Sequence, residues 1–91
     1  ANVLQTRADL LALAGKYDEA RPSYESALAV FRRITAPIGQ ANVLVELAKL
    51  AMIRGDHAAA RALIAEAEPL ADRTHNEYAL GWIGKIKAKL S

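Results

Sequence analysis

The chain contains 91 residues with a formal net charge of +2; just over half of the residues are apolar, few are aromatic, and none is cysteine. A chain of this length forms one small domain, and the absence of cysteine excludes a disulfide framework, a thiolate nucleophile and a sulfur-ligated metal. The mild charge does not support nucleic-acid binding, and no apolar run approaches the roughly 20 residues that a membrane-spanning helix needs.

The first predicted helix covers the opening residues of the chain. Val3, Leu4 and Ala8 recur with helical spacing, and Gly15 can take the left-handed conformation that ends a helix. Because Ala1 already belongs to this pattern, we interpret the chain as a piece of a longer protein. The lack of cysteine suits a reducing compartment, so we expect a cytoplasmic protein.

The second predicted helix begins with Asp18 and Glu19, because acidic residues are favoured at a helix N-terminus. Tyr24 and Phe31 belong to its expected buried stripe. The segment of residues 35–37 should end this helix, since a proline disfavours helix in the residue before it and starts a new helix well.

Two further helices and a fifth one follow the same plan. Gly55 and Asp56 should form the turn between the third and fourth helices, and a fifth helix should begin near Asn76. We expect apolar residues on one face of these helices, namely Leu44, Leu47, Ala48, Leu50, Ala51, Ala60, Leu63, Ile64, Ala67, Ala79, Trp82, Ile83, Ile86 and Leu90.

An internal repeat of 40 residues explains this regularity. Aligning residues 1–40 with residues 41–80 without a gap gives 11 identities, including the opening Ala-Asn-Val-Leu and the turn glycines. We therefore expect one domain over residues 1–91, with a first repeat over 1–40 and a second over 41–80. Residues 76–91 would form a third, partial repeat or a capping helix.

The segment Ala14-Gly15-Lys16-Tyr17-Asp18-Glu19-Ala20-Arg21, followed by Tyr24 and Ala27-Leu28, resembles the tetratricopeptide repeat. The 40-residue period is similar to the longer variant of kinesin light chains, spindle-orientation adaptors, and bacterial signalling ATPases and regulators. The resemblance implies an all-α fold of about five helices, in which antiparallel helix-turn-helix units stack as a right-handed superhelix. It also implies a protein-binding role rather than catalysis, with no cofactor.

The same resemblance implies which side chains face the concave side of such a stack. Asn2 and Asn42 recur one repeat apart, and a carboxamide can pair with any peptide backbone. An apolar patch of valine, methionine, isoleucine and tryptophan on this side would mark an interaction surface if it is open to water. The expected partner-binding residues are Asn2, Gln5, Asp9, Ala12, Leu13, Asn42, Val45, Lys49, Met52, Ile53, Trp82, Lys85 and Lys89.

No set of residues has the spacing of a catalytic or metal site. His57 and His75 lie 18 residues apart at expected turns, and Glu66 and Glu68 diverge around a helix. We therefore expect no enzyme activity, no metal and no cofactor. At the positions where chaperone-tail-binding relatives clamp a carboxylate, the chain has Gln5, Asp9, Val45 and Lys49, which argues against such a partner.

Two functional hypotheses remain open from the sequence. In the first, the chain is a scaffold or adaptor segment whose concave groove binds a peptide or helix of another protein. In the second, it belongs to the helical-arm repeats of a larger bacterial regulator or signalling ATPase, and it packs mainly within its parent protein. Self-association into a homodimer through exposed apolar helix faces would also cover the ends of the stack.

Overall fold

The computed structural model describes Gly15 and residues 17–90. Within these residues the chain forms α-helices and no strand, so the predicted all-α architecture is confirmed. The helix predicted over residues 1–14 lies outside the described residues. The described helices are α2 (Tyr17–Arg33), α3 (Pro37–Arg54), α4 (His57–Thr74) and α5 (Glu77–Leu90).

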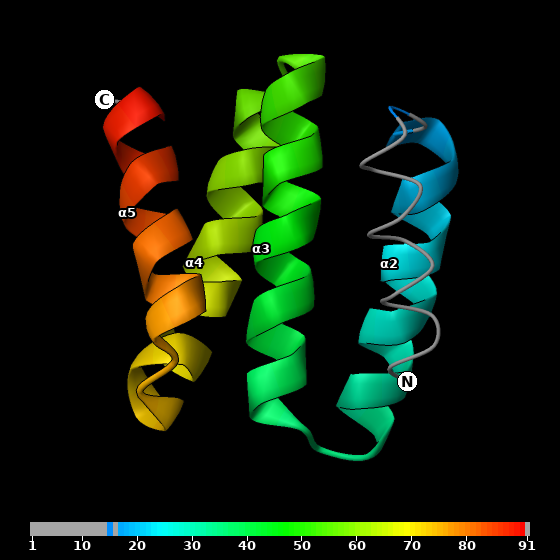
Figure 1. Cartoon of the computed structure of the whole chain (residues 1–91), viewed down its shortest axis with the longest axis vertical. Coiled ribbons are helices and arrows are strands. Elements are labelled where there is room, and N and C mark those ends of the chain that lie inside the picture. Colours follow the sequence, from blue (N-terminus) through cyan, green and yellow to red (C-terminus); the bar gives the residue numbers. More distant parts are fainter. Residues whose placement is uncertain (1–14, 16, 91) are drawn as a thin grey trace.

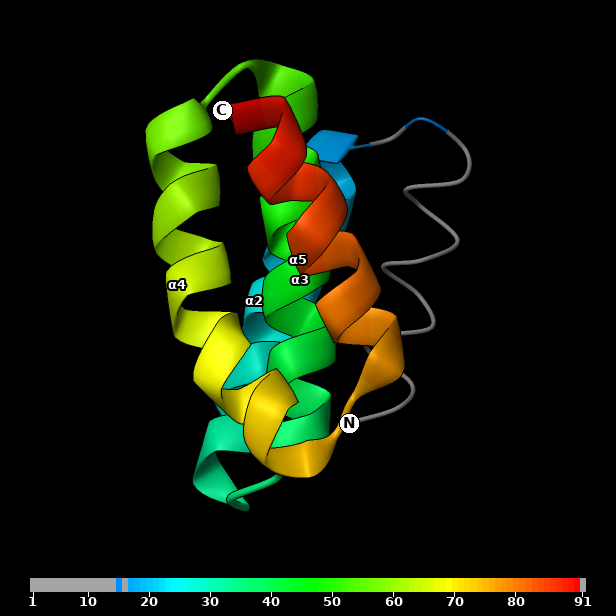
Figure 2. The same cartoon turned by 90° about the vertical axis from the view of Figure 1, so that its left-hand side faces the viewer.

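Consecutive helices run antiparallel and pack on one another (Figure 1). Helix α3 contacts α2, α4 and α5, so it occupies the centre of the described part. The view turned by 90° shows α5 lying along α3 on the side away from α2, with α4 beside both (Figure 2). This is the arrangement expected when helix-turn-helix units stack and each covers the apolar stripe of the one before.

The turns between helices recur every 20 residues. Gly55 ends α3 in a left-handed conformation with φ of 77°, and Gly15 has φ of 78°. Thr35 and His75 take the same conformation after α2 and α4, with φ of 54° and 52°. In all three described turns the residue after the left-handed one donates its N–H to the carbonyl five positions back, which satisfies a helix-end carbonyl.

The helix starts also follow local sequence signals. Pro37 opens α3, as predicted, because its fixed φ suits the first helical position and its missing N–H would have no helical partner there. The Asp56 carboxylate caps α4 by accepting the N–H of Ala59 at 3.2 Å. The carboxamide oxygen of Asn76 accepts the N–H of Ala79 at 3.2 Å, at the predicted start of α5.

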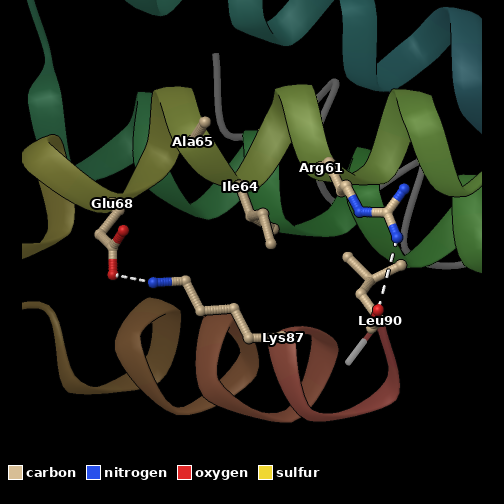
Figure 3. A pocket seen from close by; sticks show the side chains of 6 residues that line it. All are labelled: Arg61, Ile64, Ala65, Glu68, Lys87 and Leu90. Carbon is tan, nitrogen blue, oxygen red and sulfur yellow. Dashed lines mark hydrogen bonds and ion pairs between the residues drawn. The ribbon is translucent and has the colours of Figure 1, made fainter.

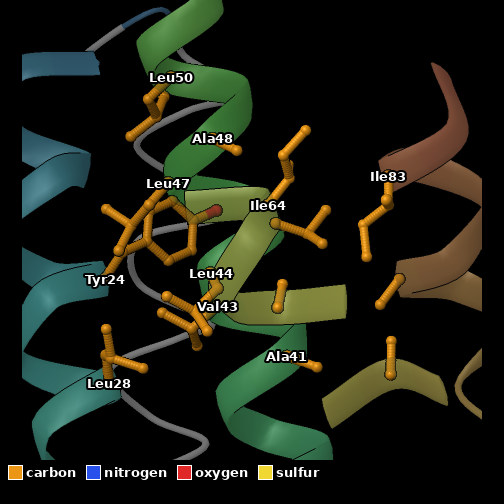
Figure 4. Close-up of a cluster of buried hydrophobic side chains, with 14 of the residues drawn as sticks. Tyr24, Leu28, Ala41, Val43, Leu44, Leu47, Ala48, Leu50, Ile64 and Ile83 are labelled. Carbon is orange, nitrogen blue, oxygen red and sulfur yellow. The ribbon is translucent and has the colours of Figure 1, made fainter. Parts of the chain in front are cut away.

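The core runs through the middle of the bundle and is made of small and branched side chains (Figure 4). Tyr24 is its largest completely buried residue, and alanines sit where helices come closest. Because alanine has a short side chain, it allows two helix backbones to approach. The buried set is Ala20, Tyr24, Ala27, Leu28, Phe31, Ala41, Val43, Leu44, Val45, Leu47, Ala48, Leu50, Ala51, Ala60, Ile64, Ala67, Ala71, Ala79, Ile83 and Ile86.

One close approach depends on a glycine. A Cβ atom on Gly39 would lie 2.6 Å from the ring of Phe31, so the aromatic ring occupies the space that a side chain would need. One repeat later the corresponding residues are Ala71 and Ala79, both completely buried. The two corners therefore reach similar packing through different pairs, one large side chain with glycine and the other two small side chains.

Candidate functional site

A pocket between α3 and α5 collects several of the predicted partner-binding residues. It has a volume of about 210 Å³ and is lined by Lys49, Met52, Ile53, Trp82, Lys85, Ile86 and Lys89. Five of these, Lys49, Met52, Ile53, Trp82 and Lys85, belong to the surface expected from the sequence, and Lys89 was also placed there. We call it the Trp82 pocket.

Trp82 lies between two ammonium groups. The Nζ atom of Lys49 is 4.1 Å from the centre of the indole ring, and Nζ of Lys85 is 4.7 Å from it. Both distances allow attraction between a cation and the π-electron face of the ring. The ring is half-buried and packs against the core, so the two lysines and the core together hold its orientation.

Glu46 fixes the position of Lys49. This carboxylate is only 8% exposed, and it pairs with the Nζ of Lys49 at 2.8 Å, one turn along α3. It also accepts hydrogen bonds from the hydroxyl groups of Tyr24, at 3.3 Å, and of Tyr78. A buried carboxylate is costly unless it is paired and hydrogen-bonded, and these three partners meet that need. Glu46 therefore joins α2, α3 and α5 directly beneath the Trp82 pocket.

The charge of the pocket is one-sided. Three lysines line it, and no acidic side chain does, because Glu46 lies beneath it. Ile53 is 56% exposed and Met52 is partly exposed, so apolar surface lies next to the ammonium groups. A ligand that matches this surface chemically carries an apolar group beside an anionic one.

Two other predicted residues have different surroundings from those expected. Val45 is completely buried, so it is not part of an accessible surface in this structure. The carboxamide oxygen of Asn42 accepts a hydrogen bond from the carboxamide nitrogen of Asn76 at 2.7 Å, and Asn76 in turn caps α5. That oxygen thus has a partner within the chain. The remaining predicted residues, Asn2, Gln5, Asp9, Ala12 and Leu13, lie outside the described residues.

The sequence analysis did not identify Glu46 and Tyr78 as neighbours of the site. Glu46 is a single acidic residue within the apolar run Val43-Leu44-Val45-Glu46-Leu47-Ala48, and a charge at a buried helix position is a recognisable signal. Its partners come from α2 and α5, and their distance along the chain gave no indication that they meet.

Two features of other classes of protein are not found in the described part of the chain. None of its helices is both long enough and apolar enough to cross a lipid bilayer. Among the same residues, no group of three or more histidine, cysteine, aspartate or glutamate side chains is placed to hold a metal ion.

Comparison with known proteins supports one family. The sequence model described as tetratricopeptide repeat matches residues 1–73, which is most of the chain. Comparisons with curated proteins and with solved structures found no match. The chain therefore belongs to the tetratricopeptide repeat family, whose members generally mediate protein–protein interactions.

Proposed function

We propose that this tetratricopeptide repeat chain binds a segment of a partner protein in the Trp82 pocket, and that this segment carries an apolar side chain next to an acidic one. The observation that carries the proposal is the indole ring of Trp82 with an ammonium group 4.1 Å from its centre and a second one at 4.7 Å. Such a site combines apolar contact area with positive charge at a single point on the surface.

The apolar part of the site supports the binding of a side chain from the partner. Trp82, Met52 and Ile53 form adjoining apolar surface, and tryptophan and methionine are among the residues that contribute most to protein interfaces. The exposed fraction of Ile53 is high for an isoleucine, and burying it against a partner would be favourable.

The basic part of the site supports an acidic neighbour. Lys85 and Lys89 lie one helical turn apart on α5, and no carboxylate in the described part of the chain pairs with either. A carboxylate of the partner would therefore meet unneutralised charge. Lys49 is already paired with Glu46, which holds it against the ring rather than leaving it to the ligand.

The proposal can be tested with peptides selected from a random display library for binding to the chain. Trp82 is the single tryptophan, so its intrinsic fluorescence reports directly on the pocket. We expect selected peptides to be rich in acidic and large apolar residues and to change this fluorescence. Substituting Ile53→Asp should weaken their binding by roughly 30-fold, since an interface hot spot is worth about 2 kcal/mol or more.

A matched control is available on the same helix. Ile38 is 55% exposed, almost the same as Ile53, but it lies in the first turn of α3, away from the pocket. Ile38→Asp should leave binding unchanged. Peptides that bind both variants equally well, or that bind without any change in the fluorescence of Trp82, would contradict the proposal.

A further inference from the structure

A second groove, between α4 and α5, lies on a different side of α5 from the Trp82 pocket (Figure 3). It has a volume of about 400 Å³ and is lined by Arg61, Ile64, Ala65, Glu68, Lys87 and Leu90. Lys87 pairs with Glu68 across one end, and at the other end Arg61 donates to the backbone carbonyl of Leu90 at 3.4 Å. We call this the α4–α5 groove.

The chain contains an equivalent groove one repeat earlier. That groove lies between α2 and α3, has a volume of about 240 Å³, and is lined in part by Arg21, Glu25, Leu47 and Leu50. Adding 40 to each of these numbers gives Arg61, Ala65, Lys87 and Leu90, all in the lining of the α4–α5 groove. The two grooves are therefore the same feature in successive repeats.

The earlier groove has a third wall that the α4–α5 groove lacks. Helix α4 lies along it and contributes Ala59, Ala62 and Leu63, which are spaced i, i+3 and i+4 and so share one helix face. Leu63 packs against the core from this position. Within the described part of the chain, no helix lies in that position against the α4–α5 groove.

We infer that the α4–α5 groove binds an amphipathic helix of acidic character from a partner protein. A helix is the matching occupant because a helix is what lies against the equivalent groove, and it should present apolar residues at i, i+3 and i+4. The groove is larger than its counterpart, partly because Ala65 stands where the earlier repeat has Glu25. Side chains bulkier than the alanines of α4, such as leucine, would fill it.

The charges at the groove indicate an acidic occupant. In the earlier repeat Arg21 pairs with Glu25 at 3.6 Å, one turn along the same helix. Arg61 has Ala65 at that position, and in the described part of the chain no carboxylate pairs with Arg61. The lining holds two cationic side chains and one carboxylate, so a carboxylate on the incoming helix near Arg61 would complete the balance.

A second copy of this chain does not offer such a helix. Among the described residues the exposed large apolar side chains are Ile34, Ile38, Ile53 and Tyr78, and they form no i, i+3, i+4 set on one helix. The suitable stripe of α4 already lies against the α2–α3 groove. The occupant is therefore assigned to a different polypeptide.

The test uses a synthetic peptide of the length of α4, 18 residues, with leucines at i, i+3 and i+4 and glutamates on the flanks. Binding to the isotope-labelled chain is followed by backbone amide NMR shifts. We expect the largest shifts at Ala65, Gly84 and Lys87, and at least about tenfold weaker binding when the flanking glutamates are lysines. The variant Ala65→Trp should abolish binding, because an indole would fill the groove.

The control variant is Ala29→Trp, which places the same bulky residue at an exposed position on α2. It should bind the peptide like the unchanged chain. Shifts confined to the Trp82 pocket, equal binding of the glutamate and lysine peptides, unaffected binding by Ala65→Trp, or no binding would each overturn the inference. Concentration-dependent dimerisation abolished by Ala65→Trp would reassign the groove to a second copy. Since Ile53→Asp does not touch this groove, the two sites are tested independently.

Discussion

Helices α3 and α5 occupy equivalent places in successive repeats, yet their surroundings differ. Val43, Leu44 and Val45 of α3 are completely buried, because α3 lies among three other described helices. The residues 40 positions later in α5 are Ile83, Gly84 and Lys85, of which only Ile83 is buried. The inward face of the repeat is thus retained in α5, whereas its outward face has changed to glycine and lysine.

This difference separates two roles that a repeat sequence combines. Positions equivalent to Ile83 contact the preceding unit and keep their apolar character in both helices. Positions equivalent to Gly84 are apolar in α3, where later helices cover them, and small or charged in α5. Burial therefore depends on which neighbours surround a helix, and intrinsic helix propensity contributes less.

The largest expected effect comes from truncating the covered position. Leu44→Ala should lower the free energy of unfolding by about 2–5 kcal/mol, since it removes a completely buried side chain and leaves a cavity. The equivalent change on α5, Gly84→Ala, should raise it by about 1 kcal/mol, because alanine is the better helix former. Urea denaturation followed by circular dichroism measures both.

The space around Gly84 makes this contrast sharp. A Cβ atom there would meet no other atom within 4 Å, so the substitution introduces no clash. Equal losses of stability at the two positions would show that the outward faces of α3 and α5 are covered alike, and the comparison would fail.

The corner between α2 and α3 should respond next most strongly. Gly39→Ala should cost about 1–3 kcal/mol, because the new methyl group would lie against the ring of Phe31. In a Phe31→Ala background the same change should be neutral or slightly stabilising, which reproduces the alanine pair of residues 71 and 79. Thermal or urea unfolding of the two single variants and the double variant gives this coupling energy. Additive effects would rule out the close contact as its cause.

The smallest expected effects concern the turns. His75→Gly should raise the free energy of unfolding by about 0.5–1 kcal/mol, since a left-handed conformation is strained for a residue with a side chain. Gly55→Ala should lower it by a similar amount. Unfolding midpoints in urea would reveal both shifts, and an unchanged midpoint for His75→Gly would mean that contacts of the imidazole offset the strain.

Local signals made much of the fold predictable. Gly55, Asp56 and Pro37 mark helix ends through backbone preferences that need no tertiary contact, and the structure confirms each of them. The left-handed Thr35 and His75 are different, because neither residue type favours that conformation. They are identified by their 20-residue spacing from the glycines and by the helices that they connect.

The candidate site was predictable in part. The spacing of Lys49, Met52, Ile53, Trp82 and Lys85 on two helices was sufficient to predict a common surface, and the structure brings these five residues into one pocket. The burial of Val45 was not predictable from that spacing, because it depends on how closely the next helices pack.

By itself, the sequence determined the helices, their turns and the repeat, because these depend on backbone conformation and on apolar spacing within a short stretch of chain. Only the tertiary structure decided that Glu46 meets Tyr24 and Tyr78, that Asn42 bonds to Asn76, and that the groove beside Arg61 has no third wall among the described helices. These features join residues 22 to 34 positions apart, and such contacts depend on how the rigid helices pack, which no local pattern specifies.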